Sequence, residues 1–262
     1  MNIKQIGLQV ARLTIWFDAS SSNINLALPE NYDRFTIPWL LDDIAKIPVT
    51  KSVLPGSDNL ILKVQHDPLF DRRKWGVPLF QADNWEIWKD ADGSLSFVSP
   101  RENPGMRIRV EPGFTSGQVI GDFSSIDDLD PMQDLGIKVF INWLAYKGDI
   151  LLHASGVMID NNGYCFVGQS GAGKSTAATL LSNNPLITIL GEDQVVLRFI
   201  DGRFWIFGTP WHLNPDMFSP EGVPLKEVLF LEKKGEEKNT EITASDGVTR
   251  LVQTAFIPYY QP

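Results

Sequence analysis

A glycine-rich stretch that ends in Lys-Ser-Thr is the part of this sequence whose residue types and spacing most directly suggest chemistry. Residues 164–176 match the phosphate-binding pattern G-x-x-x-x-G-K-[ST], with Gly168, Gly173, Lys174 and Ser175 at its fixed positions. Glycines let the backbone turn tightly and approach a ligand, and the N–H groups of the loop and of a following helix favour an anion. The pattern therefore predicts a nucleoside-triphosphate site, for example for ATP, and the alternative is a chance match.

The predicted roles of the loop residues follow from phosphate chemistry. Lys174 is expected to reach the β- and γ-phosphates, and the Ser175 hydroxyl is expected to bind Mg²⁺. The predicted nucleotide ligands are the loop and the start of its helix: Gly168, Gln169, Ser170, Gly171, Ala172, Gly173, Lys174, Ser175 and Thr176.

Two neighbouring acids follow the next apolar segment after the loop. Glu192 and Asp193 come directly after the sequence Leu-Ile-Thr-Ile-Leu-Gly of residues 186–191, which is typical of a buried strand. One carboxylate is expected to hold Mg²⁺ and the other to take a proton from an acceptor hydroxyl. The alternative is a solvated strand end, but a carboxylate pair at that place is more stable beside a cation.

His153 is the second candidate for catalysis. It lies in the apolar segment Leu151–Ala154, where a lone histidine is more often a hydrogen-bonded core residue than a catalyst. His66 has no such setting. His212 follows the turn of residues 208–211 and is a weaker candidate for the same site.

The composition excludes several functional classes. The chain has 262 residues, a net charge of −9 and no basic stripe, so binding to a nucleic-acid backbone is not expected. A single cysteine, Cys165, allows no internal disulfide and is expected to be a small buried hydrophobe. One Cys and three scattered His do not make a zinc site, and the Asn-Lys-x-Asp motif of GTPases is absent. No signal peptide or membrane-spanning run is evident, so we expect a cytoplasmic protein without a membrane partner.

Residues 1–130 are predicted to be rich in β-structure. Alternation of apolar and polar residues over 6–10 and 13–17 predicts an early strand. It also predicts a hairpin that joins 85–88 to 95–98 through Asp90–Gly93, and a strand over 106–110. Two segments rich in Pro and charge, 31–57 and 67–77, are expected to be loops.

Residues 131–262 are predicted to form the second domain. Asp130 is expected to cap a helix that begins at Pro131 and ends before Gly148. A long apolar strand over 150–159, a return strand over 164–167, a helix over 174–181, a strand over 186–190, a hairpin over 195–207 and a strand over 228–231 follow. Hairpins around a phosphate loop differ from regular βαβ alternation, so we expect an α/β fold with an α+β-like mixed sheet.

Residues 149–232 resemble the catalytic domain of HPr kinase/phosphorylase and its bacterial relatives. That family carries a Leu-His-Ala/Gly segment, a hairpin, a G-x-S-G-x-G-K-S loop and an acidic pair after the next strand, which correspond here to residues 152–156, 168–175 and 191–193. Residues 208–211 and 223–225 are similar to the same relatives. The resemblance covers about a third of the chain and implies the phosphate-loop core shared by HPr kinase and PEP carboxykinase.

The resemblance implies a kinase that uses a nucleotide and Mg²⁺ to phosphorylate a seryl hydroxyl. By position, Asp193 matches the acid that accepts the proton, His153 the active-site histidine, Lys174 the phosphate-binding lysine and Ser175 the Mg²⁺ ligand. Glu192 stands where HPr-phosphorylating members usually have a first aspartate, and the family's later glutamate metal motif and HPr-contacting segment are missing. HPr is therefore not the expected substrate, and a peptide or a small molecule is.

Several alternatives stay open at the level of sequence. The chain could be a nucleotide-binding accessory protein of a peptide-modification system that has lost turnover. A carboxykinase-like enzyme is disfavoured by the size of the chain. Relatives commonly continue with more helix, so a C-terminal part of the site could be absent. The acceptor, the oligomeric state, for which a homo-oligomer is one option, and the role of residues 1–130 are also open.

Overall fold

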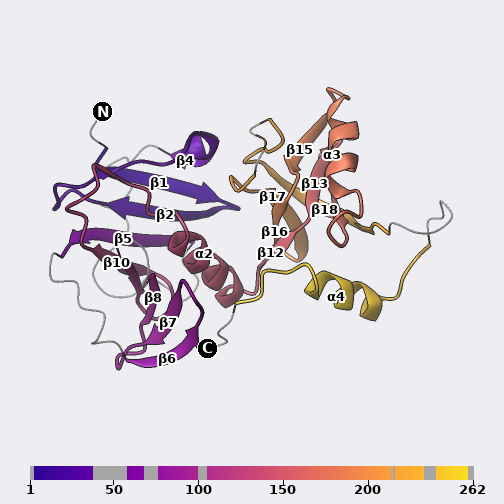
Figure 1. Cartoon of the computed structure of the whole chain (residues 1–262). Helices are drawn as coiled ribbons and strands as arrows, with labels where there is room; N and C mark the ends of the chain where they lie inside the picture. The colour runs from indigo at the N-terminus through magenta and orange to yellow at the C-terminus, as the bar shows by residue number, and fades with distance from the viewer. Residues whose placement is uncertain are drawn as a thin grey trace. The chain divides into compact units, whose positions relative to one another are not determined.

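The chain folds as two units, each built around a β-sheet of its own (Figure 1). The computed structural model describes residues 3–37, 58–67, 76–99, 105–212, 214, 216–232 and 240–258. The first unit comprises residues 1–147 with 258–262, and the second comprises residues 148–257. The fold is thus mixed α/β, with large sheets and few helices, and no helix of the described part is long and apolar enough to cross a membrane.

A nine-stranded sheet organises the first unit, in the order β4-β1-β2-β5-β10-β9-β8-β7-β6. Neighbouring strands are antiparallel except that β5 runs parallel to both β2 and β10. A short 3₁₀ helix and a two-stranded sheet accompany it. The bounds are β1 Gln5–Val10, β2 Leu13–Asp18, β3 Asn25–Leu26, η1 Glu30–Phe35, β4 Thr36–Ile37, β5 Asn59–His66, β6 Val77–Gln81, β7 Glu86–Lys89, β8 Leu95–Ser99, β9 Met106–Val110, β10 Ser116–Gly121 and β11 Asp128–Leu129.

The strands that the alternating patterns predict in this unit are present. The expected early strand is an antiparallel pair, β1 with β2; the hairpin is β7 with β8, and the strand after it is β9. The predicted loop 31–57 is wrong at its start, because η1 buries Tyr32 and Phe35 and β4 pairs with β1. Residues 38–57 and 68–75, which make up most of the two predicted loops, lie outside the described residues.

Helix α2, Leu135–Tyr146, belongs to the first unit and begins later than expected. Asp130 does accept a hydrogen bond from the Met132 N–H at 2.9 Å, but residues 131–134 form a turn rather than the first helical turn. The helix packs against β8 and β9 of the nine-stranded sheet. The structural division therefore falls after α2, at 147/148, and not at the predicted 130/131.

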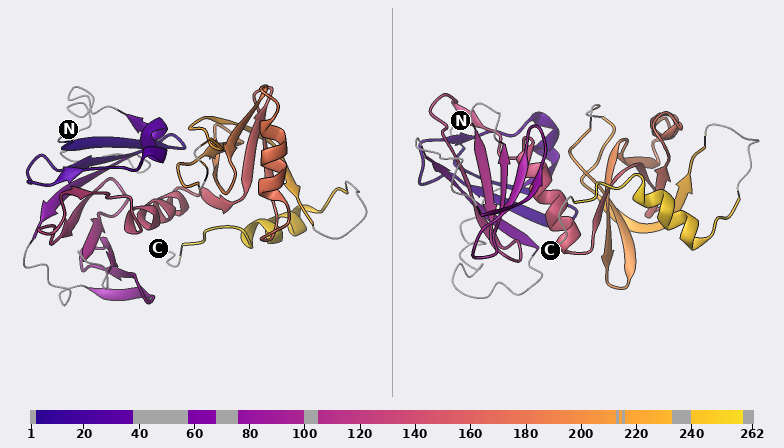
Figure 2. Two further views of the ribbon diagram at one scale, coloured as in Figure 1. Left: turned by 45° about the horizontal axis from the view of Figure 1, so that its top comes forward. Right: turned by 60° about the horizontal axis from the view of Figure 1, so that its bottom comes forward.

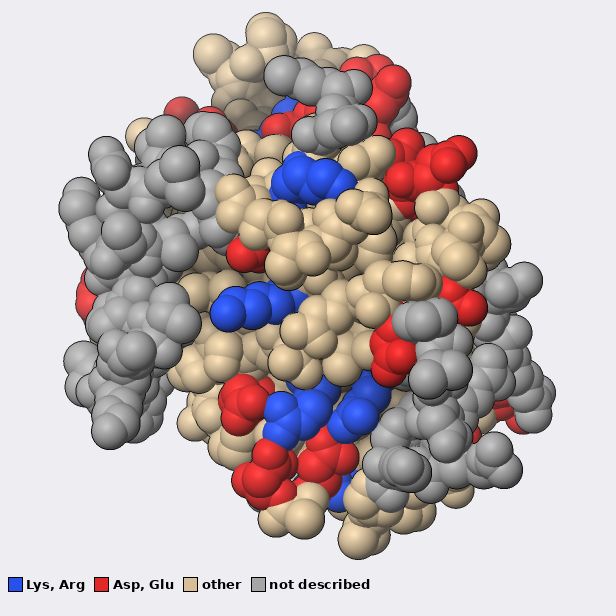
Figure 3. Space-filling view, turned by 90° about the vertical axis from the view of Figure 1, so that its left-hand side faces the viewer, with Lys and Arg blue, Asp and Glu red and all other residues tan. Residues whose placement is uncertain are grey.

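Charged side chains of the first unit neutralise one another locally. Asp90 accepts hydrogen bonds from Arg107 at 2.7 Å and from Arg109 at 3.0 Å, and Arg109 also pairs with Glu111 at 2.7 Å. In the lower part of the face drawn in Figure 3, basic side chains likewise lie among acidic ones. The arginines of β9 thus form ion pairs with neighbouring acids and do not make a basic binding surface.

A mixed seven-stranded sheet organises the second unit, in the order β12-β16-β17-β18-β14-β13-β15. Only β14 and β18 are a parallel pair among these neighbours. Helix α3 packs against β13 and β15, as the views of Figure 2 also show. The bounds are β12 Ile150–His153, β13 Ser155–Ile159, β14 Asn162–Val167, α3 Lys174–Ser182, β15 Ile187–Gly191, β16 Gln194–Ile200, β17 Arg203–Gly208, β18 Gly222–Phe230 and α4 Ala244–Val252.

The apolar segment 150–159 is two strands rather than the one expected. The chain changes partners at Ala154, so that β12 pairs with β16 while β13 pairs with β14 and β15. The turn that follows is centred on Asp160 and Asn161, whose φ values of 50° and 59° suit a two-residue hairpin, and Asn162–Gly163 already belong to β14. This break sets His153 at the end of β12, where its side chain is half-exposed.

The interior of the second unit confirms the expected role of Cys165. Its side chain is fully buried in an apolar cluster with Leu152, Val167 and Ile206. Burial raises the pKa of this thiol to about 12, so it stays protonated at neutral pH. Cys165 is therefore a packing residue in β14, the strand that leads into the glycine-rich loop.

Candidate active site

The glycine-rich loop has the strand–loop–helix context that a phosphate site requires. Strand β14 ends at Val167, residues 168–173 form the loop, and α3 begins at Lys174. Gly173 adopts φ 104°, a left-handed conformation that side chains disfavour. Gly168 is fixed for a different reason, because a Cβ there would lie 2.8 Å from the Leu231 carbonyl oxygen and 2.9 Å from the Ala172 Cβ.

The start of α3 offers donors to an anion. The residue before the helix, Gly173, provides no side-chain cap, and the first N–H groups of any helix lack intrahelical acceptors. Within the loop, the Ala172 N–H donates to the Gln169 carbonyl at 3.0 Å, which closes the turn below these donors. Ser175 and Thr176 lie exposed on the first turn of the helix. An uncapped helix start of this kind favours phosphate oxygens.

The Lys174 side chain turns back onto its own loop. Its Nζ donates to the Gly168 carbonyl oxygen at 2.8 Å and to that of Gln169 at 3.4 Å. Burial lowers the pKa of this amine, and the charge of Asp193 acts in the opposite direction. Lys174 is thus a buried cation beside the loop, held by carbonyl groups that a phosphate oxygen can replace as its partner.

His153 and Asp193, predicted separately from the sequence, lie in direct contact. The His153 Nδ1 is 3.0 Å from the Asp193 Oδ1, and 39% of each side chain is exposed. The backbone holds the pair in place, because the Ala154 N–H donates to the Asp193 carbonyl at 3.0 Å and the His153 N–H to that of Thr254 at 2.8 Å. With Nδ1 as the donor to Asp193, the Nε2 of a neutral imidazole is free to accept a proton.

Glu192 precedes Asp193 at the end of β15 and is half-buried. The Ser155 hydroxyl donates to the Glu192 carbonyl oxygen at 2.5 Å, which ties this corner to the first residue of β13. The two neighbouring acids therefore occupy a fixed corner of the sheet.

His212, the weaker candidate, lies close enough to Asp193 to sense its charge. Its ring stacks on Phe218 with centroids 5.5 Å apart, and its Nε2 is 3.2 Å from the Thr209 hydroxyl oxygen. Burial lowers the pKa of His212 to about 4 against the smaller opposing effect of Asp193. His212 is thus a neutral packing group behind the site. His66, by contrast, belongs to the first unit, where its Nδ1 accepts a hydrogen bond from the Phe123 N–H at 3.1 Å.

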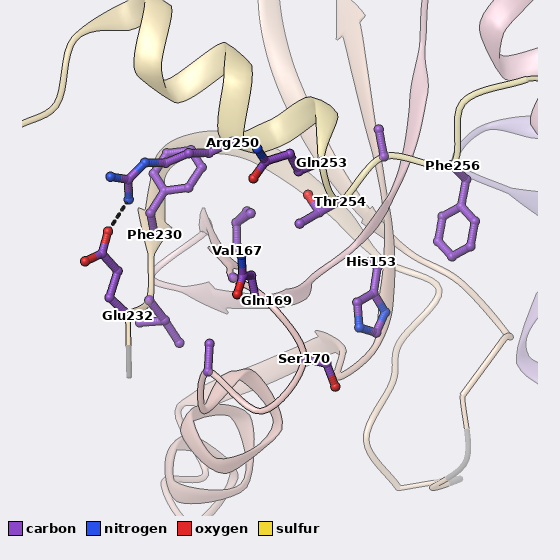
Figure 4. Close-up of a pocket in the computed structure, with 14 residues that line it drawn as sticks. His153, Val167, Gln169, Ser170, Phe230, Glu232, Arg250, Gln253, Thr254 and Phe256 are labelled. Atoms are coloured by element: carbon purple, nitrogen blue, oxygen red, sulfur yellow. Dashed lines mark hydrogen bonds and ion pairs between the residues drawn. The ribbon is translucent and has the colours of Figure 1, made fainter. Parts of the chain in front are cut away.

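A pocket of about 980 Å³ opens between the loop and the segment that contains α4 (Figure 4). His153 lies at one side of it, next to Ser170 and Phe256, and Arg250 with Phe230 and Glu232 lies at the other. Its lining comprises His153, Val167, Gly168, Gln169, Ser170, Ala172, Phe230, Leu231, Glu232, Arg250, Gln253, Thr254, Ala255 and Phe256. The pocket is thus lined both by the loop and by His153, the histidine that contacts Asp193.

The wall made by residues 250–256 was not predicted from the sequence. After α4 the chain returns to β12, where the Phe256 N–H donates to the Leu151 carbonyl at 2.9 Å and Ala255 forms a bridge with Leu152. Thr243, whose hydroxyl accepts from the Asp246 N–H, marks the start of α4 and is a capping signal legible in the sequence. That signal locates a helix but does not reveal which pocket the helix covers.

The three residues predicted to hold Mg²⁺ all carry oxygen ligands. Ser175, Glu192 and Asp193 supply hydroxyl and carboxylate oxygens, which this hard cation prefers. Among the residues that the structure describes, no three His, Cys, Asp or Glu side chains form a metal-binding group. Mg²⁺ at phosphate loops takes most of its ligands from phosphate oxygens and water, so a sparse set of protein oxygens suits it.

A comparison of the chain with models of known protein families finds no match, and neither does a comparison with curated proteins.

Proposed function

We propose that this protein is an ATP- and Mg²⁺-dependent kinase that transfers the γ-phosphoryl group to a hydroxyl, by resemblance a seryl hydroxyl, of a peptide or a small molecule. The observation that carries the proposal is the contact of Asp193 with His153, because His153 lines the same pocket as the loop residues Gly168, Gln169, Ser170 and Ala172. A phosphate loop alone supports only binding. A carboxylate and an imidazole beside it supply the proton acceptor that transfer to a hydroxyl needs.

The proposed reaction moves one phosphoryl group and one proton. The acceptor oxygen attacks the γ-phosphorus, the bond between that phosphorus and the β,γ-bridging oxygen breaks, and ADP leaves with the bond's electrons. Lys174 and the N–H groups at the start of α3 bind the phosphates, while Ser175 with Glu192 and Asp193 would hold Mg²⁺. When bound, Mg²⁺ neutralises part of the phosphate charge.

The hydroxyl proton goes to the His153–Asp193 pair. Asp193 accepts it directly, or the His153 Nε2 accepts it while Asp193 orients the ring through Nδ1.

The direct test is transfer of ³²P from [γ-³²P]ATP, with Mg²⁺, to free serine and to a panel of serine-containing peptides. We expect transfer by the natural protein, a loss of about 10²-fold or more in kcat for Asp193→Asn, and weaker ATP binding for Lys174→Ala. Glu227→Gln, at an acid of β18 outside the pocket lining, is the matched control and should keep full activity. Absence of transfer to every acceptor, with Asp193→Asn indistinguishable from the natural protein, contradicts a kinase.

A second candidate function is a nucleotide-binding accessory protein without turnover. Two features favour it: Glu192 stands where an aspartate is expected by resemblance, and the Lys174 Nζ is bound to loop carbonyls. Tight ATP binding without ADP release over hours supports this function. If the protein releases ADP and Lys174→Ala abolishes that release, the accessory function without turnover is rejected.

A further inference from the structure

The side of the pocket away from His153 is built from a different kind of residue than the loop. Phe230, Glu232, Arg250 and Gln253 line it, and they come from the end of β18 and from α4 (Figure 4). A triphosphate bound at the loop does not need this volume. This side of the pocket can therefore hold a further part of the ligand.

Phe230 is held next to the start of the loop by the sheet. It is the last residue of β18 and pairs with Val167, the last residue of β14, and the Leu231 N–H donates to the Val167 carbonyl at 2.7 Å. Parallel pairing brings the ends of both strands to the same edge. A group that extends from phosphates on the loop can therefore reach Phe230 without any change in the sheet.

Arg250 presents a flat, anchored surface at the same place. Its guanidinium lies 5.7 Å from the centre of the Phe230 ring and forms an ion pair with Glu232 at 2.6 Å. The carboxylate offsets the positive charge and limits rotation of the guanidinium plane. Arg250 is still 39% exposed, so part of its surface is open to a ligand.

We infer that Arg250, supported by Phe230 and Glu232, is the stacking surface for the nucleobase of the donor nucleotide. Bases stack on guanidinium and aromatic planes, and a purine gains more from this contact than a pyrimidine because its ring system is larger. A guanidinium that a carboxylate already neutralises suits a base better than a phosphate. This inference rests on the proposed nucleotide site and assigns the part of the ligand that the loop leaves unbound.

The assignment also gives the nucleotide a direction. With its base at Arg250 and its phosphates on the loop, the terminal phosphate lies toward His153, whose side chain is across the pocket from Arg250 (Figure 4). The acceptor hydroxyl then approaches from the side of His153 and Phe256. The two ends of one pocket thereby serve the donor base and the transfer reaction.

The test compares ATP with inorganic tripolyphosphate, which carries the phosphates without base or ribose, by isothermal titration calorimetry in the presence of Mg²⁺. We expect the natural protein to bind ATP at least about tenfold more tightly than tripolyphosphate. Arg250→Ala and Arg250→Lys should both lose most of that preference, since neither side chain provides the plane. Their affinity for tripolyphosphate should stay unchanged, which also shows that the variants fold.

Arg203→Ala is the matched control. Arg203 also lies over an aromatic ring, 4.9 Å from the centre of Trp205, but it belongs to β17 and does not line the pocket. This variant should keep the full preference for ATP.

Three outcomes overturn the inference. If the natural protein binds ATP and tripolyphosphate with equal affinity, it has a phosphate site but no subsite for the base. Full preference for ATP in Arg250→Lys shows that charge, not stacking, does the binding. If neither ATP nor tripolyphosphate binds, the loop is not a phosphate site, and the proposed function is wrong as well.

Discussion

Asp193 interacts with three basic residues of the second unit, His153, Lys174 and His212. His153 contacts it at 3.0 Å, and its charge influences the pKa of both Lys174 and His212. That setting suits either a proton acceptor or a metal ligand, which are the two roles predicted for it.

The buried His212 gives a prediction about pH. Its pKa is lowered from 6.5 to about 4, so between these values the unfolded chain binds a proton that the native protein does not. Stability is therefore fully present above pH 6.5 and falls as the pH drops toward 4. Replacing the titrating ring by a non-titrating one of similar shape, His212→Phe, should remove this part of the pH dependence.

Urea unfolding at pH 7 and pH 4.5 measures the effect. We expect the natural protein to lose about 2–3 kcal/mol more than His212→Phe over this interval. His66→Phe, at a half-exposed histidine of the first unit, is the control for general effects of removing a histidine. Parallel losses in the natural protein and in His212→Phe would show that His212 is not held neutral by burial.

At the level of elements, the junction of the loop with α3 is the most sensitive point of the site. Gly173 combines φ 104° with open space around its Cα, so a side chain there meets strain rather than a clash. Gly168 shows the opposite case, because its Cα is packed against Leu231 and Ala172. The two glycines of the sequence pattern are therefore required for two different reasons.

Gly173→Ala should lower both stability and nucleotide affinity. Forcing alanine into a left-handed conformation costs about 1–2 kcal/mol, and relief of that strain moves the first N–H groups of α3. Thermal unfolding and titration with MgATP measure the two effects.

Gly202→Ala is the control that separates the loss of stability from the loss of nucleotide affinity. Gly202 has φ 80° in the β16–β17 turn, and a Cβ added there would meet no atom within 4 Å, so alanine carries similar strain at a place outside the loop. We expect a comparable loss of stability in this control and no loss of affinity. If Gly173→Ala binds MgATP as tightly as Gly202→Ala does, the geometry of the loop does not govern binding.

At the level of the whole molecule, every residue assigned to the site belongs to the second unit. The loop, His153, the acids 192–193 and the pocket wall 250–256 all lie within residues 148–257. This unit also has apolar clusters of its own and a buried ion pair between Asp149 and Arg198, with Oδ2 and Nε 2.6 Å apart. The nine-stranded first unit therefore contributes none of the residues assigned to the site.

Residues 148–257 expressed alone should fold and bind MgATP with the affinity of the whole chain. We expect a cooperative thermal transition by circular dichroism and an unchanged titration curve, because the core and the pocket are both contained in this segment. The segment with Lys174→Ala is the control for binding at the loop. A segment that folds cooperatively but does not bind shows that residues of the first unit complete the site.

The sequence alone determined the local features of this protein. Alternation of apolar residues located β1, β2, β7, β8 and β9, and the glycine pattern located the strand, loop and helix around Lys174. These features depend on neighbours along the chain, through turn chemistry and side-chain periodicity. The start of α2 and the split at Ala154 were missed because tertiary contacts, and not local preference, decide where those elements begin and change partners.

Only the tertiary structure decided which distant residues meet. The sequence provided His153 and Asp193 as separate candidates, and the return of the chain along β16 and β12 put them 3.0 Å apart. Arg250 had no signal at all, since its place opposite Phe230 depends on the segment after α4 pairing with Leu151 and Leu152. Pairings between strands far apart in sequence follow from burial and backbone hydrogen bonding over the whole sheet, which no local pattern encodes.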